Sequence, residues 1–246
     1  MVGISVLLLF IGLLLPAIPQ PQYYHHFADQ RTWLGIRNAA DVLSNLPFAI
    51  AGFWGLSLLL FSSQNISFYD PRERWLWLCI AIGLVLVALG SGYYHLDPSN
   101  SRLVWDRLPM VIVFMSFVAA IIFDRINASL GFFLWPVLLV VGLLSVLQWY
   151  VSELHGAGDL RFYAGVQAYT FLVAIVMLLL PSHYDRSRDI AVIFIGYGFA
   201  KLFEMTYNQI YNFTGHLISG HSLKHLAAGL AGLWMIGMIW KRQNTD

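Results

Sequence analysis

Eight apolar runs, each about as long as a membrane-spanning helix, occupy most of this 246-residue chain. The hydrocarbon core of a bilayer is roughly 30 Å thick, so a spanning helix needs about 20 apolar residues. Because backbone groups in lipid must be satisfied within each segment, continuous runs of this length indicate helices. We therefore expect an all-α polytopic transmembrane bundle that forms a single domain over residues 1–246. The runs lie at about residues 2–19, 42–62, 75–95, 104–123, 131–151, 163–181, 189–209 and 220–240.

Composition supports this class and excludes others. The chain is 59% hydrophobic and 11% charged, with a formal net charge of +1, so nucleic acid is not an expected partner. Its one cysteine, Cys79, excludes an intramolecular disulfide and a cysteine-based zinc cluster. The first run has no basic n-region and no small-residue cleavage site, so we interpret it as a retained helix rather than a secretory signal.

The distribution of basic residues predicts the orientation. Eight spans place both termini on one side of the membrane, and that side carries more arginine and lysine than the other. Positive charge marks the cytoplasmic side, so both termini are predicted to be cytoplasmic. The basic residues on that side are Arg72, Arg74, Arg125, Arg186, Arg188, Lys241 and Arg242.

Polar and titratable residues gather at one end of the runs. Such groups are costly within a bilayer and usually face the bundle interior, where each one suggests a function. In the predicted topology all of them fall in the non-cytoplasmic leaflet. The most notable are Ser91 and His95 at the end of the third run, Asp106 early in the fourth, and His221 and His225 early in the last.

The three histidines predict a metal site. His221 and His225 are four residues apart on a helix, so both rings project from one face, as two ligands of one metal would. His95 lies at the same depth on another helix. Three imidazoles with one open position form the usual catalytic zinc arrangement, so zinc is the expected ion. Iron or manganese would usually recruit a carboxylate, which Asp106 could supply.

Asp106 and Ser91 each have two interpretations. Asp106 could accept a proton from a metal-activated water molecule, or it could simply cap the start of its helix. Ser91 lies one turn before His95 and could donate to an oxyanion, or it could bond back to a carbonyl of its own helix. Both residues are candidate catalytic groups.

Further polar residues lie at the same depth. Asp41, Ser44 and Asn45 could orient the ligand histidines or could bond to neighbouring helices. Lys201 and Glu204 are expected to form a structural pair, and Lys224 is expected to point away from both neighbouring histidines toward the interface. The remaining histidines are expected on solvated surface: His25, His26, His155, His183 and His216.

Taken in order, these motifs resemble the alkaline ceramidase family within the CREST superfamily of seven-helix membrane hydrolases. The matching elements are Ser44-Asn45, Ser91-x-x-x-His95, Asp106 followed by Leu108-Pro109-Met110, and Gly220-His221-Ser222-Leu223-x-His225. The resemblance implies a seven-helix hydrolase core at about residues 41–240, with the run at 2–19 as an added helix.

The same resemblance implies site roles. His95, His221 and His225 would bind zinc, and Asp106 and Ser91 would act on the water and the carbonyl. Eukaryotic members also bind calcium through an acidic cluster. The corresponding region of this chain has no glutamate, which argues against calcium; it offers Asp29, Trp33, Asn38 and Asp41.

The function expected from this resemblance is hydrolysis of the N-acyl bond of ceramide or a related lipid amide by a membrane-embedded zinc enzyme. Three alternatives remain open. The same centre could serve a lipid esterase or phospholipase. The protein could be a zinc-containing heptahelical receptor or lipid-binding protein, or a transporter that uses Asp106 and the histidines as a proton relay.

Overall fold

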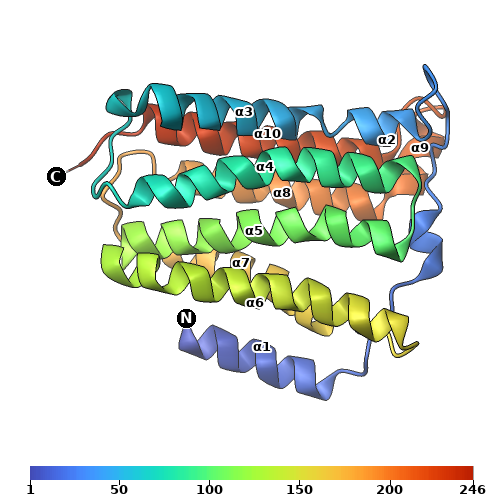
Figure 1. Ribbon diagram of the computed structural model, residues 1–246, viewed down its shortest axis with the longest axis horizontal. Helices are drawn as coiled ribbons and strands as arrows, with labels where there is room; N and C mark the ends of the chain where they lie inside the picture. Colours follow the sequence, from blue (N-terminus) through green and yellow to red (C-terminus); the bar gives the residue numbers. More distant parts are fainter. Residues whose placement is uncertain (246) are drawn as a thin grey trace.

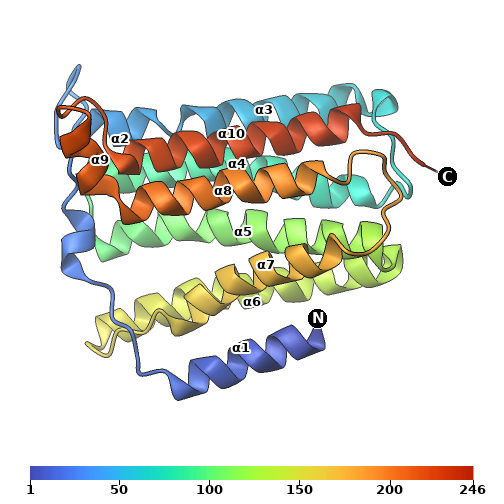
Figure 2. The same ribbon diagram turned by 180° about the vertical axis from the view of Figure 1, so that it is seen from behind.

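The computed structural model describes residues 1–245, and all of its regular elements over that range are helices. The long helices lie side by side in one bundle (Figures 1 and 2). Two short 3-10 turns, η1 (Gln22–His25) and η2 (Ser63–Asn65), lie between them. The α-helices are α1 (Val2–Leu14), α2 (Ala39–Leu43), α3 (Leu46–Phe61), α4 (Glu73–Leu96), α5 (Asn100–Arg125), α6 (Ala128–Leu154), α7 (Arg161–Met177), α8 (Asp189–Met205), α9 (Tyr207–Phe213) and α10 (Gly220–Lys241).

The prediction of a helical membrane protein is confirmed. Each apolar run contains a helix, and five helical stretches are long and apolar enough to cross a membrane. Helices α8 and α9 provide a sixth if the pair counts as one span, although they meet at an angle of 79°. The five stretches are α2 with α3, then α4, α5, α6 and α10.

Two of the expected spans are shorter than predicted. The run at 2–19 is helical only to Leu14, because Pro16 forces Leu15 into extended backbone. Its 13 residues make a helix about 20 Å long, less than the roughly 30 Å of a bilayer core. The run at 163–181 ends at Met177, and its 17-residue helix is about 26 Å long.

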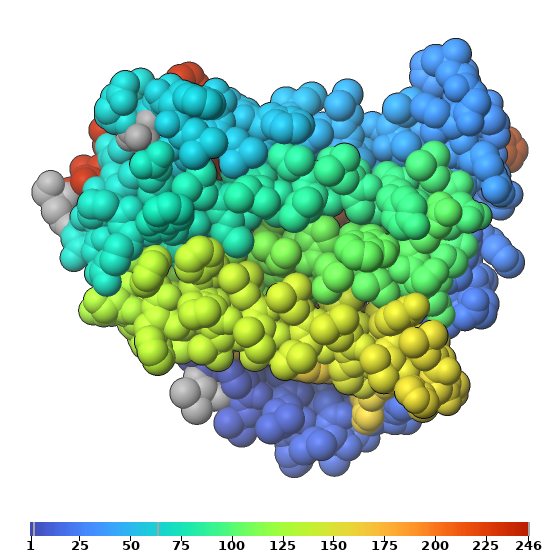
Figure 3. Space-filling view, viewed as in Figure 1, coloured from blue at the N-terminus to red at the C-terminus, as the bar shows by residue number. Residues whose placement is uncertain are grey.

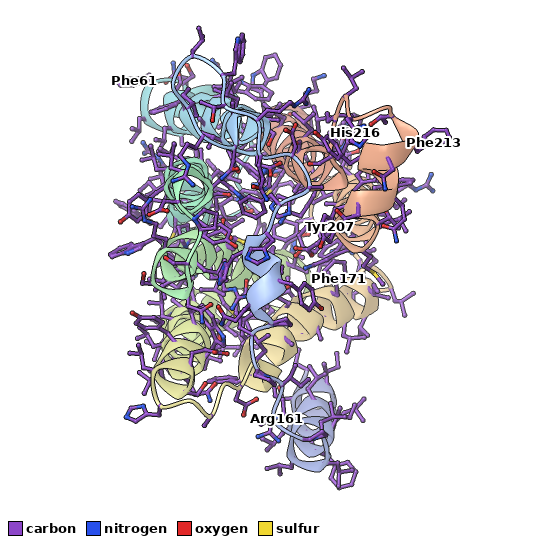
Figure 4. All side chains as sticks on the ribbon, turned by 90° about the vertical axis from the view of Figure 1, so that its right-hand side faces the viewer. Phe61, Arg161, Phe171, Tyr207, Phe213 and His216 are labelled. Carbon is purple, nitrogen blue, oxygen red and sulfur yellow. The ribbon has the colours of Figure 1, made fainter. Side chains whose placement is uncertain are left out.

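Helix α1 is attached to the edge of the bundle by an arginine. The Arg161 Nη1 donates to the carbonyl oxygens of Gly12 at 3.0 Å and Leu15 at 2.5 Å. A helix C-terminus leaves such carbonyls unpaired, so the guanidinium supplies their missing donors. Arg161 itself is held by Asp159, and this hydrogen-bonded guanidinium lowers the pKa of the Asp159 carboxyl. Figure 4 shows Arg161 beside α1.

Helix α5 lies at the centre of the bundle, and α6 lies at its surface. Of the apolar 18-residue window in each helix, 78% is buried for α5 and only 22% for α6. α6 crosses the face seen in Figure 3. Its exposed apolar side chains recur every three or four residues, as a lipid-facing stripe does. They are Phe133, Val137, Val140, Leu144, Leu147 and Val151.

The two ends of the bundle differ. Both termini point toward one end, on the left in Figure 1. At the other end, α4 finishes and α5 and α10 begin, which brings the polar residues of these helices together. The segment between α1 and α2 crosses this end, as Figure 4 shows in blue. This end therefore contains the candidate site and its cover.

Candidate metal centre

Three buried histidines from two helices converge at this end of the bundle. His95 is the next-to-last residue of α4, and His221 and His225 lie in the first two turns of α10. Their side chains are almost fully buried, and one ring nitrogen from each lies within 4.8 Å of the other two. Within the described residues, this is the one group of three or more histidines, cysteines or carboxylates that are so close together.

The spacing of the ring nitrogens fits a metal ion. The Nε2 atoms of His95 and His221 are 3.3 Å apart. Two nitrogens bound at about 2.0–2.1 Å to one tetrahedral zinc are separated by about 3.3–3.4 Å. The three ring centroids are 4.7 to 4.9 Å apart. One nitrogen pair thus has the separation that a shared zinc requires and the third nitrogen lies within 4.8 Å, so the group could hold a metal ion, and its all-imidazole donor set suits zinc.

Hydrogen bonds to the second ring nitrogen fix the orientation of His225. Its Nδ1 lies 3.1 Å from the carbonyl oxygen of Asp41 and 2.9 Å from the Ser44 hydroxyl. The Asn45 amide nitrogen is 3.4 Å from the same atom. A carbonyl acceptor at Nδ1 favours the tautomer whose Nε2 is free to bind metal. Of the two interpretations, the structure supports the orienting one for Ser44, whereas the Asn45 amide donates to the Asp41 carbonyl oxygen at 2.9 Å and supports the acceptor instead.

The Asp41 carboxylate holds the start of α10. Its Oδ1 accepts hydrogen bonds from the hydroxyls of Ser222 at 2.6 Å and Ser219 at 3.3 Å. Ser219 is also the N-cap, since its hydroxyl accepts from the backbone N–H of Ser222. These contacts fix where α10 begins and thus where His221 and His225 lie. The sequence motif around His221 includes Ser222 but gave neither serine a role, although a Ser-x-x-Ser pattern before an apolar run resembles a helix start.

The segment between α1 and α2 covers the histidines. The ring of Phe27 packs against those of His95 and His221, with centroid separations of 4.7 and 5.0 Å. The Asn38 side chain donates to the carbonyl oxygen of His95 at 2.8 Å. A phenylalanine in a loop gives no signal in a single sequence, so Phe27 could not have been selected in advance. It shields the candidate metal site from water.

Two of the histidines expected on solvated surface are structural. The His25 ring lies between the Tyr94 hydroxyl at 3.0 Å and the Asn100 side-chain oxygen at 2.9 Å. Burial lowers the pKa of the His25 imidazole, which favours the neutral ring that these two partners require. His183 stacks on Tyr69 and contacts Asp124. The prediction of a solvated position was wrong for His25, whose partners come from distant parts of the chain, whereas His183 lies in a loop and keeps 32% of its side chain exposed.

Ser91 and Asp106 border one cavity together with His225. The cavity has a volume of about 430 Å³, and His95 and His221 are not among the residues that line it. Asp106 is the seventh residue of α5, whose N-cap is Ser99, so the capping interpretation of Asp106 is wrong. Both Ser91 and Asp106 are buried. The structure therefore brings one candidate ligand and both candidate catalytic groups to a shared space.

The wall of this cavity is mainly apolar. Such a wall suits an acyl chain. The apolar lining residues come from six helices, α3, α4, α5, α7, α8 and α10, and among them are Phe48, Leu84, Val113, Phe171, Ile193 and Met235.

Lys224 does not point away as expected. Its Nζ lies 3.2 Å from Glu204 Oε1, its side chain is only 16% exposed, and it borders the cavity. The predicted pair of Lys201 and Glu204 is confirmed at 2.8 Å. Glu204 thus binds both lysines and also accepts a hydrogen bond from the Tyr24 hydroxyl at 3.2 Å. The prediction for Lys224 was wrong because an acceptor on α8 draws its ammonium group inward.

Comparison with known proteins does not identify a family. No protein-family model matches the chain, and no curated protein matches it in sequence. The resemblance to alkaline ceramidases therefore rests on the motifs alone and stays a prediction. The geometry of the site has to support any function on its own.

Proposed function

We propose that this protein is a zinc-dependent intramembrane amidase that hydrolyses the N-acyl bond of ceramide or a related lipid amide. The products would be a free fatty acid and a sphingoid base. The observation that carries the proposal is the shared cavity. His225 of the histidine group, the Asp106 carboxylate and the Ser91 hydroxyl all face one mainly apolar space inside the bundle.

The three histidines would hold the zinc, which when bound lowers the pKa of water and polarises a carbonyl group. Asp106 would accept a proton from the water molecule that attacks the amide carbon. As the carbon–nitrogen bond breaks, the same residue returns the proton to the leaving amine. Ser91 would donate a hydrogen bond to the carbonyl oxygen as negative charge develops on it.

The rest of the cavity would bind the substrate and exclude water. Its apolar wall, formed by α3, α4, α5, α7, α8 and α10, would hold the acyl chain, and burial of the chain would supply binding energy. Phe27 and the segment around it would keep bulk water from the histidines. A dry site strengthens the polar interactions that stabilise the transition state.

The test is release of fatty acid by detergent-solubilised protein from a panel of ceramides, N-acyl amino lipids and phospholipids. Asp106→Asn should keep its zinc and lose about 10²–10⁴-fold in turnover, the usual effect of removing a positioned acid–base group. Ser91→Ala should lose up to about 10³-fold. Asp97→Asn is the matched control, because Asp97 is an exposed aspartate outside the cavity.

Other outcomes would change the assignment. Release from phospholipid but not from ceramide would identify an esterase or phospholipase on the same centre. No release from any lipid, with zinc fully bound, would indicate a receptor or a lipid-binding protein. Loss of zinc in Asp106→Asn would make the aspartate a ligand or a support for one.

We further propose that both termini are cytoplasmic and that the zinc site lies in the non-cytoplasmic leaflet. The arginine and lysine bias supports this orientation, and the two termini point toward the end of the bundle away from the histidines (Figure 1). Single cysteines introduced at Ser99 and at Thr245 in a Cys79→Ser background would be labelled from either side of the membrane. Labelling of Ser99→Cys from the cytoplasm would invert the orientation.

A further inference from the structure

Arg107, the residue after Asp106, borders the cavity and is almost fully buried. Its guanidinium lies over two aromatic rings, 4.0 Å from the centroid of Trp149 and 4.8 Å from that of Tyr163. Its Nη2 donates to the side-chain oxygen of Gln20 at 2.6 Å. These contacts hold the guanidinium in one position without neutralising its charge.

The charge of Arg107 has no carboxylate partner. No aspartate or glutamate oxygen lies within 4.0 Å of its guanidinium over residues 1–245, and its buried Nη1 has no hydrogen-bond partner there. Arginine stays protonated in proteins. A buried charge without a partner is strongly unfavourable, so such groups are normally paired. The missing partner is therefore expected to arrive with a ligand.

The other charges around the cavity do not remove this excess. Its wall carries three cationic side chains, Arg107, Lys201 and Lys224, against two carboxylates, Asp106 and Glu204. Glu204 is already bound to both lysines. Asp106 is needed as the base in the proposed reaction. The wall therefore carries one more positive than negative charge, and Arg107, beside the candidate catalytic carboxylate, is the one cation of this wall without a carboxylate contact within 4.0 Å.

We propose that the cavity selects a lipid amide whose headgroup carries a carboxylate or phosphate, and that Arg107 binds this anionic group. The inference rests on the proposed function, since it names the substrate class of the same site: it favours the related anionic lipid amides over ceramide itself, whose headgroup is neutral. A guanidinium held flat by Trp149 and Gln20 presents its remaining donors in a fixed fork, which matches two anionic oxygens. The acyl chain then occupies the apolar part of the cavity, and the amide lies beside Asp106.

The test compares lipids that differ only in headgroup. N-oleoylglycine carries a carboxylate, N-oleoylethanolamine is its neutral counterpart, and the phosphate ester of N-oleoylethanolamine supplies the phosphate. Binding to the full-length protein is measured at 4 °C by displacement of a fluorescent fatty alcohol, and fatty-acid release is followed in the same samples. The wild type should bind at least one anionic lipid about tenfold or more tightly than the neutral one, as expected for a charge-assisted hydrogen bond.

The variants separate Arg107 from general charge effects. Arg107→Gln should abolish the preference for anionic lipids. Arg102→Gln is the matched control, because Arg102 is also on α5 and lies over an aromatic ring, 4.5 Å from the centroid of Tyr93, but is not part of the cavity wall. It should keep the full preference. If Arg107→Gln does not fold, Arg107→Lys replaces it: the charge stays but the fork is lost, so a reduced preference is expected.

Two results would overturn the inference. One is equal binding of the anionic and neutral lipids by the wild type, and the other is an unchanged preference in the Arg107 variants. Failure of the proposed function looks different. Preference for an anionic lipid that depends on Arg107, without release of fatty acid, would leave the anion site intact and refute the hydrolase. Release from the neutral lipid alone, independent of Arg107, would do the reverse.

Discussion

A β-carbon on Gly90 would lie only 2.0 Å from the carbonyl oxygen of Trp105. The backbones of α4 and α5 thus meet at a glycine, one residue before Ser91 and one before Asp106. Pro109, inside α5, has no N–H to donate to the Trp105 carbonyl four residues earlier. This bare carbonyl faces the glycine, and the contact sets the separation of the two candidate catalytic residues.

The first prediction concerns Gly90→Ala. The added methyl group must push α5 away from α4, since the atom it meets, the Trp105 carbonyl oxygen, belongs to rigid backbone and cannot rotate aside. Overpacking of this kind costs typically about 1–3 kcal/mol. The melting temperature in detergent should fall, and the proposed fatty-acid release should fall with it.

The control for this change is another glycine in a helix. Gly165 on α7 has no atom within 4 Å of the place where its β-carbon would lie. Gly165→Ala should therefore leave the melting temperature unchanged or raise it slightly, because alanine favours helix. An equal melting temperature for Gly90→Ala and wild type would show that the two helices separate freely at this point.

A second prediction concerns the metal. The purified protein should carry about one zinc per chain, as a three-histidine site with one open position does. His221→Ala or His225→Ala should remove most of it, since two remaining imidazoles bind zinc poorly. Elemental analysis of the purified protein measures this directly. His155→Ala is the control, because His155 is exposed and lies outside the histidine group. Full zinc content in both variants would exclude the site.

Much of this arrangement was predictable because it follows from helix geometry and chain direction. Residues four apart share a helix face, which brings His221 and His225 together. The end of one span and the start of the next lie at the same membrane surface, which placed His95 and Asp106 at the same depth. Apolar length identified where the helices lie, although only five of the helical stretches are long and apolar enough to cross a membrane.

Other features depend on contacts between distant segments, which a single sequence does not reveal. Lys224 turns inward because Glu204 on α8 accepts its charge. Phe27 reaches the histidines only because the segment after α1 crosses the end of the bundle. The 79° bend between α8 and α9 lies at Thr206, within a run that reads as continuous.

A third prediction concerns the groups that orient His225. Ser44→Ala removes the hydroxyl that lies 2.9 Å from His225 Nδ1, while the Asp41 carbonyl stays in place. Loss of such a supporting contact typically costs about 10–100-fold in metal affinity. Competition with a chelator of known affinity measures the change. Ser57→Ala, an exposed position further along the same span, should bind zinc as the wild type does.

The last prediction concerns the opposite end of the bundle. The Arg242 guanidinium lies 2.8 Å from the Glu73 carboxylate, both side chains are almost fully buried, and the Tyr184 hydroxyl donates to the same carboxylate. Arg242→Ala leaves the glutamate buried without its counter-charge, which typically costs about 3–5 kcal/mol. The melting temperature should fall sharply, while zinc content should stay the same because the histidines are at the far end. Lys241→Ala, one residue earlier and exposed, should change neither quantity.

Combining Arg242→Met with Glu73→Gln should restore most of the lost stability, because no unpaired charge then remains. A double variant as unstable as Arg242→Ala would show that packing of the arginine, rather than its charge, holds the C-terminus in place.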